Sequence, residues 1–583
     1  MRVDISKGGA ASELLHSPEF RAQWERLYAD CPWASVFQSF AYASTWYEVY
    51  QSRFTPLLVD AYDQGGQLSG LFPLAVDANG SLVAAGGRQA EYQVWLARPG
   101  EGDAFIEAAV ERLTAEFPGR TLTLRYVPPN APLQWLRNRD IARRCVMRSV
   151  RRGLMDLREV DAEAALRKKN NRIKLNRLQR VGPVEYERLT EPEAIDALLE
   201  QIVPFCDLRH GAVHDVLPFR GDPLKLPFHR ALARVPGLLY VSVLRCGPAV
   251  ASAQIEIDNR GQLAVGLGAW SPSLTHCSPG RLQLLFLARD VARRGHRSID
   301  LTPGGGYKDL LASRFDEVHT LAVYLGTHRS AASATIEAAK RLTKSALVRF
   351  GADPAKLVTR AARLRDVLGS TGADGGWVRA LSAFRDRIWD DREVQLFQIN
   401  TRVWADLPVQ TPLRVDCIAD LVSYRQGVSG LEARRTFLRR ALSLLERGAR
   451  PYTRVENDDL VVSGWISASP EELDGVSLPG DAGAATAVVH DLSVAARFGV
   501  VEWMSILPQL ARDAIALPNV TRALVAVPSD RAHLREAVHR INGTYVGSLH
   551  ARTRGARTRT WSTVQRNTAP GPALDRRPAG ALC

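Results

Sequence analysis

The sequence predicts an α/β protein in which mixed central sheets are flanked by helices. Short segments of alternating apolar and polar residues, typical of strands, are separated by helical segments along most of the chain. Several strand pairs are joined by turn residues, as in the DQGG stretch at 63–66. The order of helices and strands repeats along the 583 residues, so we expect three similar units.

The composition is that of an ordinary globular protein, with 46% hydrophobic and 24% charged residues. No apolar stretch approaches the ~20 residues of a membrane span, and the N-terminus lacks the apolar core of a signal peptide. We therefore expect a cytoplasmic protein. The seven cysteines stand singly and form no CxxC pair, which indicates reduced thiols and no metal site. The net charge of +14 favours anionic partners, although the excess of arginine can also reflect a GC-rich gene.

The first predicted unit covers residues 1–160. Its helices in residues 19–50 carry many aromatic side chains at spacings typical of core packing. We expect strands at Pro56–Ala61, Ser69–Val76, Leu122–Val127 and Cys145–Leu157, and a helix at Ala104–Glu116. No glycine-rich loop precedes this helix, so we interpret the first unit as a copy of the fold without a cofactor site.

A basic run at 167–180, RKKNNRIKLNRLQR, opens the second predicted unit, 161–327. It holds seven Arg or Lys residues and no acid. Its few apolar residues form one narrow stripe, which is typical of a solvated helix. The alternatives are contact with a nucleotide-linked substrate or with the inner face of a membrane. RNA is a third alternative, although aromatic residues for base stacking are absent.

The middle of this second unit predicts a helix at Glu191–Cys206 and three strands between Leu238 and Ala269. Between them we expect a loop rich in basic and histidine side chains. Arg209 and His210 lie in that predicted loop, together with His214 and Arg220, and are candidates for substrate binding.

Residues 278–281, Ser-Pro-Gly-Arg, begin a strongly apolar predicted helix that Gly295 ends. Ser278 suits the N-cap and Pro279 the first helical position, and Gly280 allows a ligand to approach the backbone. The free amides and the partial positive charge of such a helix end suit a phosphate or pyrophosphate, and Arg281 adds a full charge. A plain start to a buried helix is the alternative.

After a predicted strand at Ser298–Leu301, glycines 304–306 lead into Tyr307 and Lys308. The motifs FQSFAYASTWYEVY (37–50), GLFPLAV (70–76), the basic run, SPGRL and DLTPGGGYK (300–308) together resemble the CelD/BcsL-type acetyltransferases. This family of the GNAT superfamily is similar in layout to the FemABX aminoacyltransferases. The resemblance spans about residues 20–325 and implies tandem GNAT-like domains.

The resemblance also implies a reaction. It implies acyl transfer from acetyl-CoA or another acyl-CoA, without a metal, to an anionic sugar or cell-envelope precursor, as in exopolysaccharide biosynthesis. The match to the family's GxYK element makes Tyr307 and Lys308 candidate site residues, and Gly306 beside them is a candidate for substrate binding.

Direct acyl transfer needs a base, donors for the oxyanion and an acid for the leaving thiolate. Glu256 is the candidate base, and Asp258 lies on the same face of its predicted strand. Tyr307 is the candidate acid, and Lys308 is placed to steady negative charge.

The rest of the chain predicts a helical linker at 328–392, a third GNAT-like unit at 393–561 and a disordered tail at 562–583. In the third unit the phosphate loop would be 496–502, where only Arg497 and Gly499 fit the expected RGxG pattern.

Two other functions stay open at this point. The protein could be a FemABX-like aminoacyltransferase that uses charged tRNA, which the basic run would serve. It could also be a non-catalytic module that binds acyl-CoA or a nucleotide sugar.

Overall fold

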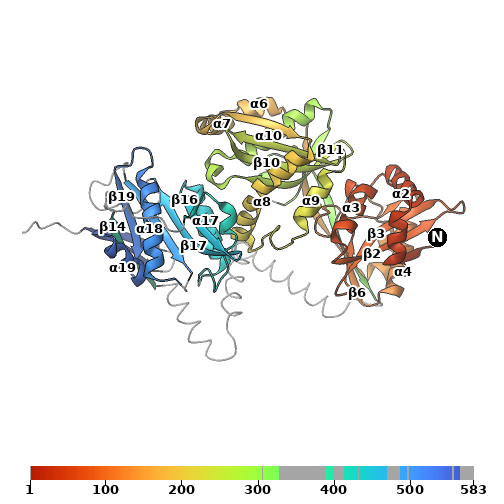
Figure 1. Ribbon diagram of the computed structural model, residues 1–583. Coiled ribbons are helices and arrows are strands. Elements are labelled where there is room, and N and C mark those ends of the chain that lie inside the picture. Colours follow the sequence, from red (N-terminus) through yellow and green to blue (C-terminus); the bar gives the residue numbers. More distant parts are fainter. Residues whose placement is uncertain are drawn as a thin grey trace, which may run out of the picture. The chain divides into compact units, whose positions relative to one another are not determined.

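The computed structural model describes residues 2–304, 306–326, 389–399, 412–430, 432–468, 486–495, 498–554 and 557–564. These residues fall into two compact units. Unit 1 ends at Gly326 and excludes 211–215, and unit 2 holds the described residues from Trp389 onward. Each unit is built on one mixed sheet with helices packed against it (Figure 1). Residues 328–388 of the predicted linker and 565–583 of the predicted tail lie outside the described residues.

Unit 1 contains a sheet of thirteen strands in the order β1-β2-β3-β4-β6-β13-β7-β12-β11-β10-β9-β8, with β5 paired to β3. The strands are β1 Asp4–Lys7, β2 Phe54–Tyr62, β3 Leu68–Asp77, β4 Leu82–Ala84, β5 Leu96–Ala97, β6 Arg120–Val127, β7 Cys145–Asp156, β8 Val184–Leu189, β9 Leu239–Cys246, β10 Ala249–Asn259, β11 Gln262–Trp270, β12 Ser298–Pro303 and β13 Arg314–Leu325.

Some helices of unit 1 begin at a side-chain cap. Ser17 and Asp161, for example, accept backbone N–H groups at the starts of α2 and α6. The helices are α1 Gly9–His16, α2 Pro18–Asp30, η1 Val36–Gln38, α3 Phe40–Tyr50, α4 Gly102–Glu116, η2 Gln134–Arg137, α5 Arg139–Ala142, α6 Ala162–Arg167, α7 Lys169–Val181, α8 Pro192–His214, α9 Lys225–Ala233, η3 Pro272–Cys277, α10 Pro279–Arg293 and α11 Gly306–Asp309.

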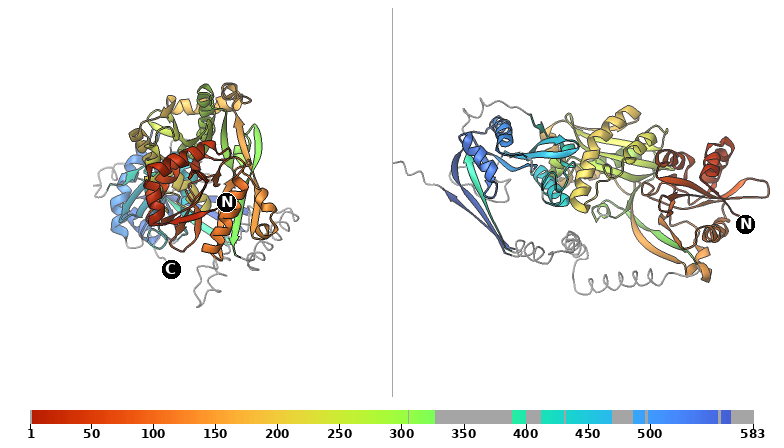
Figure 2. Two further views of the ribbon diagram at one scale, coloured as in Figure 1. Left: turned by 90° about the vertical axis from the view of Figure 1, so that its right-hand side faces the viewer. Right: turned by 60° about the horizontal axis from the view of Figure 1, so that its bottom comes forward.

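The two predicted halves of unit 1 repeat one strand order and share two long strands. The first half reads β1-β2-β3-β4-β6-β13-β7, and the second reads β8-β9-β10-β11-β12-β7-β13. The shared strands β7 and β13 pair antiparallel from Cys145↔Val323 to Leu154↔Arg314, side by side in Figure 2. Each half therefore takes one inner strand from the other, and the two halves form one continuous sheet.

In the second half the sheet opens between two parallel strands. β11 and β12 pair only from Gln262↔Ser298 to Ala264↔Asp300. Beyond that point β11 stays with β10 and β12 stays with β7, so the two strands diverge. Helix α10 follows the far end of β11. The first half has a similar opening between the parallel strands β4 and β6, which pair at Leu82↔Leu122. Helix α4 lies between these two strands in the sequence.

Helices cover both faces of the second half (Figure 1). Side chains of β9 alternate between the faces, as a strand requires. Tyr240 and Leu244 pack with α10, whereas Val241 and Val243 pack with α8. In the first half the predicted aromatic core is confirmed, because Trp24, Trp46 and other members are fully buried.

Helix α9 of the second half packs against α3 of the first. The Phe228 ring lies 5.5 Å from the Tyr42 ring and 5.8 Å from the Tyr50 ring. The halves are thus joined by a helix contact as well as by the sheet.

The predicted loop around His210 is wrong, because Arg209, His210 and His214 belong to the long helix α8. The helix tolerates Pro204, and the buried Leu208 and Ala212 continue its apolar stripe past that proline. The Asp207 carboxylate then accepts the backbone N–H groups of Phe219 and Arg220 and fixes the turn after the helix.

Unit 2 holds the described residues of the third predicted unit, 393–561. Its sheet has the order β15-β16-β17-β18-β19-β14-β20-β21. Strand β14, the first of these in the sequence, lies between β19 and β20. The elements are β14 Trp389–Gln398, β15 Arg414–Val415, α16 Ile418–Leu421, α17 Arg434–Glu446, β16 Arg450–Glu456, β17 Asp459–Ser467, β18 Thr486–Val494, α18 Val500–Ile515, β19 Arg522–Pro528, α19 Ala532–Arg540, β20 Thr544–Arg554 and β21 Arg557–Val564.

The edges of unit 2 differ slightly from the predicted bounds. Strand β14 begins inside the predicted linker, and β21 runs three residues into the predicted tail. Arg497 of the predicted phosphate loop lies outside the described residues. None of the helices that the structure describes is long and apolar enough to cross a membrane.

Candidate functional site

The start of α10 differs in one respect from the prediction. Pro279 is the first helical residue, as predicted, but Ser278 adopts a left-handed backbone (φ 50°) and its hydroxyl caps no amide. The Ser278 carbonyl instead accepts the N–H groups of Arg281 and Leu282, at 3.1 and 3.3 Å. Since Pro279 has no N–H, the helix end offers fewer free amides than predicted, and any anion held here depends more on nearby cations.

Gly280 lies against an aromatic ring. A Cβ at Gly280 would lie 3.3 Å from the ring of Trp270, at the end of β11. The guanidinium of Arg209 stacks 4.0 Å from the same ring. The structure therefore brings Arg209 close to the predicted donor loop. His210 points elsewhere, with its Nδ1 2.9 Å from the carbonyl oxygen of Cys206 within α8.

The basic helix α7 lies beside this loop. Arg281 Nε donates to Asn171 Oδ1 at 3.0 Å, and the buried Asn171 amide in turn donates to the Ala165 carbonyl. Burial raises the pKa of the Cys277 thiol, and the nearby Arg177 partly opposes that rise. The basic run and the Ser278–Arg281 loop thus form one positive surface, although the sequence analysis treated them as separate features.

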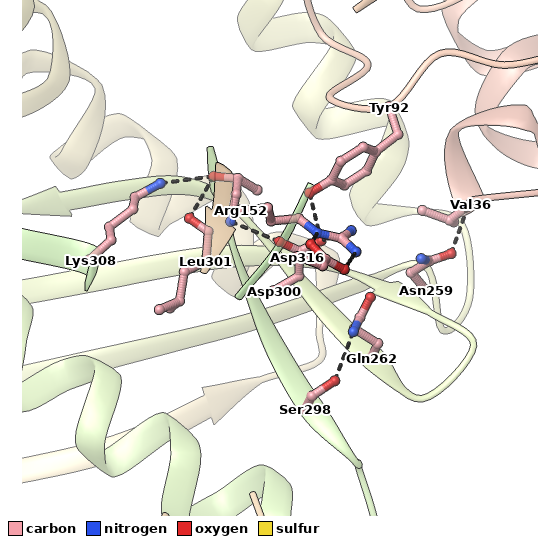
Figure 3. A network of polar contacts seen from close by, with 11 residues as sticks. Val36, Tyr92, Arg152, Asn259, Gln262, Ser298, Asp300, Leu301, Lys308 and Asp316 are labelled. Atoms are coloured by element: carbon pink, nitrogen blue, oxygen red, sulfur yellow. Dashed lines mark hydrogen bonds and ion pairs between the residues drawn. The ribbon is translucent and has the colours of Figure 1, made fainter. Parts of the chain in front are cut away.

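Lys308 lies beside the end of β12. Its Nζ donates to Thr302 Oγ1 at 2.8 Å, and Thr302 Oγ1 donates to the Leu301 carbonyl (Figure 3). Burial lowers the pKa of Lys308, while the carboxylates of Glu91 and Asp300 oppose this. Gly306 and Tyr307 form the start of α11. Lys308 is therefore a partly desolvated cation near acids from both halves.

Thr302 is held in an unusual backbone conformation. Its φ of 58° is left-handed, which is rare for a β-branched residue and costs roughly 1–3 kcal/mol. The pairing of β12 with β7 shifts register at this point, between Asp300 and Pro303. The distortion places the Thr302 hydroxyl where Lys308 can reach it.

A buried ionic network joins the two halves next to Thr302. Asp300 Oδ2 accepts the Tyr92 hydroxyl at 2.6 Å and Arg152 Nη1 at 3.0 Å. Asp300 Oδ1 accepts the Thr302 N–H, and Arg152 also pairs with Asp316 (Figure 3). Burial raises the pKa of Asp300, and Arg152 opposes the rise. The sequence analysis missed this network, although the acid within the apolar run SIDL was a signal of a special position.

A cleft with a volume of about 430 Å³ lies beside the network, lined by Tyr92 and Arg152 and by residues of both halves. It lies on the face of β12 that carries Ser298 and Asp300, whereas Ile299 and Leu301 pack with α10 on the opposite face.

Glu256, the predicted base, lies apart from this network. It is fully buried, pairs across the sheet with Tyr240 on the α10 face, and neither carboxyl oxygen has a hydrogen-bond partner among the described residues. Burial raises the pKa of Glu256 well above its usual value. Asp258 accepts the Gly261 N–H and pairs with His296 at 3.0 Å. The base role of Glu256 stays a prediction, which its burial opposes.

Within the described residues, no group of His, Cys, Asp and Glu side chains could hold a metal ion.

Between α6 and α11 the chain combines the two diverging parallel strands β11 and β12, helix α10 between them in the sequence, and Lys308 after β12. Residues 165–309 match the model of the acetyltransferase (GNAT) domain. The match includes α7, α10, Asp300 and Lys308, and the first half and unit 2 lie outside it. Domains of this kind generally use acyl-CoA as a co-substrate, and the match supports an acyltransferase.

Several solved structures are similar to part of this chain. The C-terminal domain of a putative lysylphosphatidylglycerol synthetase from Agrobacterium fabrum is 11% identical, with a TM-score of 0.36, over 58% of this chain and 97% of that chain. FemX is 11% identical, with a TM-score of 0.35, over 52% and 94%. A tandem GNAT protein from the clavulanic acid biosynthesis pathway is 15% identical, with a TM-score of 0.34, over 55% and 99%. No curated protein matches the sequence.

Proposed function

We propose that the protein is an acyltransferase that moves an acyl group from acyl-CoA to a hydroxyl or amine of a polysaccharide or cell-envelope precursor. The observation that carries this proposal is the GNAT domain match, which runs from the basic helix α7 to Lys308. The open pair β11 and β12, and the charged start of α10 beside it, fit that function.

The donor's phosphates would lie at the start of α10. Arg281 and Arg177 supply positive charge there, and α7 exposes further basic residues to solvent. The residues therefore fit a pyrophosphate mainly through guanidinium groups, which bind phosphate oxygens in pairs.

The thioester would lie between the diverging ends of β11 and β12. The acceptor oxygen or nitrogen attacks the thioester carbonyl and releases its own proton to water, the C–S bond breaks, and the leaving thiolate takes up a proton. Lys308, held by Thr302, is the cation that would stabilise the oxyanion. Tyr307 is the proposed proton donor to the thiolate. Glu256 is fully buried and neither of its carboxyl oxygens has a hydrogen-bond partner among the described residues, so we assign it no step.

A binding experiment tests the donor site. Acetyl-CoA is titrated calorimetrically into the wild type, Arg281→Glu and the control Arg293→Glu, which reverses an exposed charge at the far end of α10. We expect the Kd to rise roughly tenfold or more for Arg281→Glu and to stay within twofold for the control. Higher salt should weaken binding. Equal affinities for all three proteins would remove the donor from this loop.

A second candidate function is aminoacyl transfer from charged tRNA. The specific observation is α7, where Arg172, Arg177 and Arg180 are exposed. The same surface would serve an acidic membrane face if the protein acts in the cytoplasm beside a membrane. Saturable tRNA binding that Arg172→Glu weakens, without binding of acetyl-CoA, would favour this candidate. Acyl-CoA binding without turnover on any acceptor would instead indicate a non-catalytic module.

A further inference from the structure

The cleft beside the ionic network is strongly basic. Its lining includes five arginines, which come from β7 and the turn after it, the β10–β11 turn, the residue before β12 and the start of β13. Asp156 is its one carboxylate among the described lining residues. The five are Arg152, Arg158, Arg260, Arg297 and Arg314. A concave site with this charge attracts anions more strongly than isolated surface arginines do.

Three of these arginines are already paired with carboxylates. Arg158 pairs with Asp156 at 2.8 Å, and Arg314 lies 3.4 Å from the same carboxylate. Arg152 is neutralised by Asp300 and Asp316 at the inner end of the cleft. The paired arginines therefore leave little charge for a ligand.

Arg260 and Arg297 are different. Arg260 donates to the backbone carbonyls of Cys31 and Tyr28 and stacks 4.3 Å from the Tyr28 ring, so it is held in place by neutral groups. Arg297 donates to the Arg260 carbonyl at 3.3 Å. Neither forms an ion pair with a carboxylate in the part of the chain that the structure describes. Two guanidinium groups that line one cleft without a paired carboxylate suit a phosphate, whose oxygens accept several N–H donors at once.

Neutral polar groups lie beside this pair. Gln262 Nε2 donates to Ser298 Oγ at 2.8 Å, and Asn259 Oδ1 accepts the Val36 N–H (Figure 3). The remaining amide atoms of Asn259 and Gln262 can exchange hydrogen bonds with hydroxyl groups. Amides and a hydroxyl together suit a sugar ring.

From this arrangement we propose that the cleft binds the acceptor as a sugar phosphate, with the phosphate on Arg260 and Arg297 and the sugar against Asn259, Gln262 and Ser298. The role of this ligand as the acceptor rests on the proposed acyltransferase function, whereas the binding of a sugar phosphate in the cleft does not depend on that function. Arg152 and Tyr92 line the cleft and also hold Asp300. Asp300 also accepts the Thr302 N–H, so hydrogen bonds through Asp300 connect the lining of the cleft to Thr302 and Lys308.

The test uses the full chain and α-D-glucose 1-phosphate as the probe, with methyl α-D-glucoside as the neutral comparison. The variants are Arg297→Ala, Arg297→Lys and the control Arg293→Ala, an exposed arginine outside the cleft. We expect glucose 1-phosphate to bind and the neutral glucoside to bind at least tenfold more weakly. Arg297→Ala should weaken glucose 1-phosphate binding at least fivefold, Arg297→Lys less, and Arg293→Ala by less than twofold. Arg297 is exposed, so Arg297→Ala should keep the thermal unfolding temperature of the wild type.

Two further arms separate the sources of a sugar phosphate. UDP-glucose represents a nucleotide-linked acceptor, and vesicles containing phosphatidylinositol represent a lipid-linked one. Loss of binding by Arg297→Ala in either arm identifies the source.

The outcome is independent of the donor test. If acetyl-CoA fails to bind while Arg297→Ala weakens glucose 1-phosphate, the proposed function falls and the cleft assignment stands. If glucose 1-phosphate does not bind, or binds equally to the wild type and Arg297→Ala, or is weakened as much by Arg293→Ala, the cleft assignment is overturned.

Discussion

The two halves of unit 1 share a backbone plan but differ in the charges placed on it. In both halves a helix follows the opening between parallel strands, and the next strand carries a left-handed residue, Tyr126 in β6 and Thr302 in β12. The helix of the first half begins with acid, because Glu101 and Asp103 flank Gly102. The helix of the second half begins beside Arg281.

The openings also differ in packing. A Cβ at Gly102 would lie 2.5 Å from Pro132 and 2.7 Å from the Trp33 ring, so the first opening is closed by side chains. Leu124 stands in β6 just before the register shift, where β12 has Asp300. The fold therefore supplies only the opening, and a few side chains decide whether that opening can receive an anion.

The largest effect should follow from making the second half resemble the first. Asp300→Leu leaves Arg152, Tyr92 and the Thr302 N–H without their buried acceptor, so we expect a loss of about 3–5 kcal/mol in the free energy of unfolding. Chemical denaturation measures it. Asp316→Asn, at a more exposed partner of Arg152, should cost less. Full stability of Asp300→Leu would show that the network is dispensable to the fold.

The next effect concerns the contact between the halves. Burial lowers the pKa of His229, beside Phe228 in α9, to about 4. Between about pH 6.5 and pH 4 the unfolded chain therefore binds more protons than the folded one, so stability is full above pH 6.5 and falls as the pH drops. The loss should reach about 3 kcal/mol.

Thermal unfolding of unit 1 at several pH values measures this loss, with His229→Gln as the variant that cannot titrate. We expect the difference in unfolding temperature between the wild type and His229→Gln to change between about pH 6.5 and pH 4. We also expect both halves to unfold in one transition. Separate transitions for the halves would contradict the view that they form one cooperative unit.

A matched pair of substitutions tests whether the first opening is closed and the second open. Gly102→Ala should destabilise the protein by roughly 1–3 kcal/mol, because the new methyl group meets Pro132 and Trp33. Gly280→Ala meets only the edge of Trp270 at 3.3 Å, and better helix propensity offsets that contact to within about 1 kcal/mol. Equal costs, measured by chemical denaturation, would remove this difference between the halves.

The smallest effect concerns the strained residue. Thr302→Gly relieves the left-handed backbone but loses the hydroxyl, so stability should change by no more than about 1 kcal/mol. Thr302→Ala keeps the strain and loses the hydroxyl, so it should be less stable than Thr302→Gly. The reverse order of the two variants in denaturation would show that Thr302 is not strained.

Local patterns allowed much of the fold to be predicted. The start of α10 at Pro279, its end before Gly295 and strand β12 depend on neighbouring residues, and all three were predicted correctly. The ionic network was not, because Tyr92, Arg152 and Asp300 are far apart in the sequence and meet only through the shared strands. The helical state of His210 was missed because the basic and histidine side chains after Cys206 are typical of a loop, and alternation alone could not decide which face of the sheet buries Glu256.

The exchange of β7 and β13 has a consequence for synthesis of the chain. The first half cannot complete its sheet until β13 leaves the ribosome, roughly 170 residues after β7, which takes about 10–30 s at ordinary rates of translation. During that time the apolar edge of β6 lacks its partner and resembles an edge strand open to aggregation. The nascent protein should therefore depend on chaperones more than a protein of two separately folding domains does.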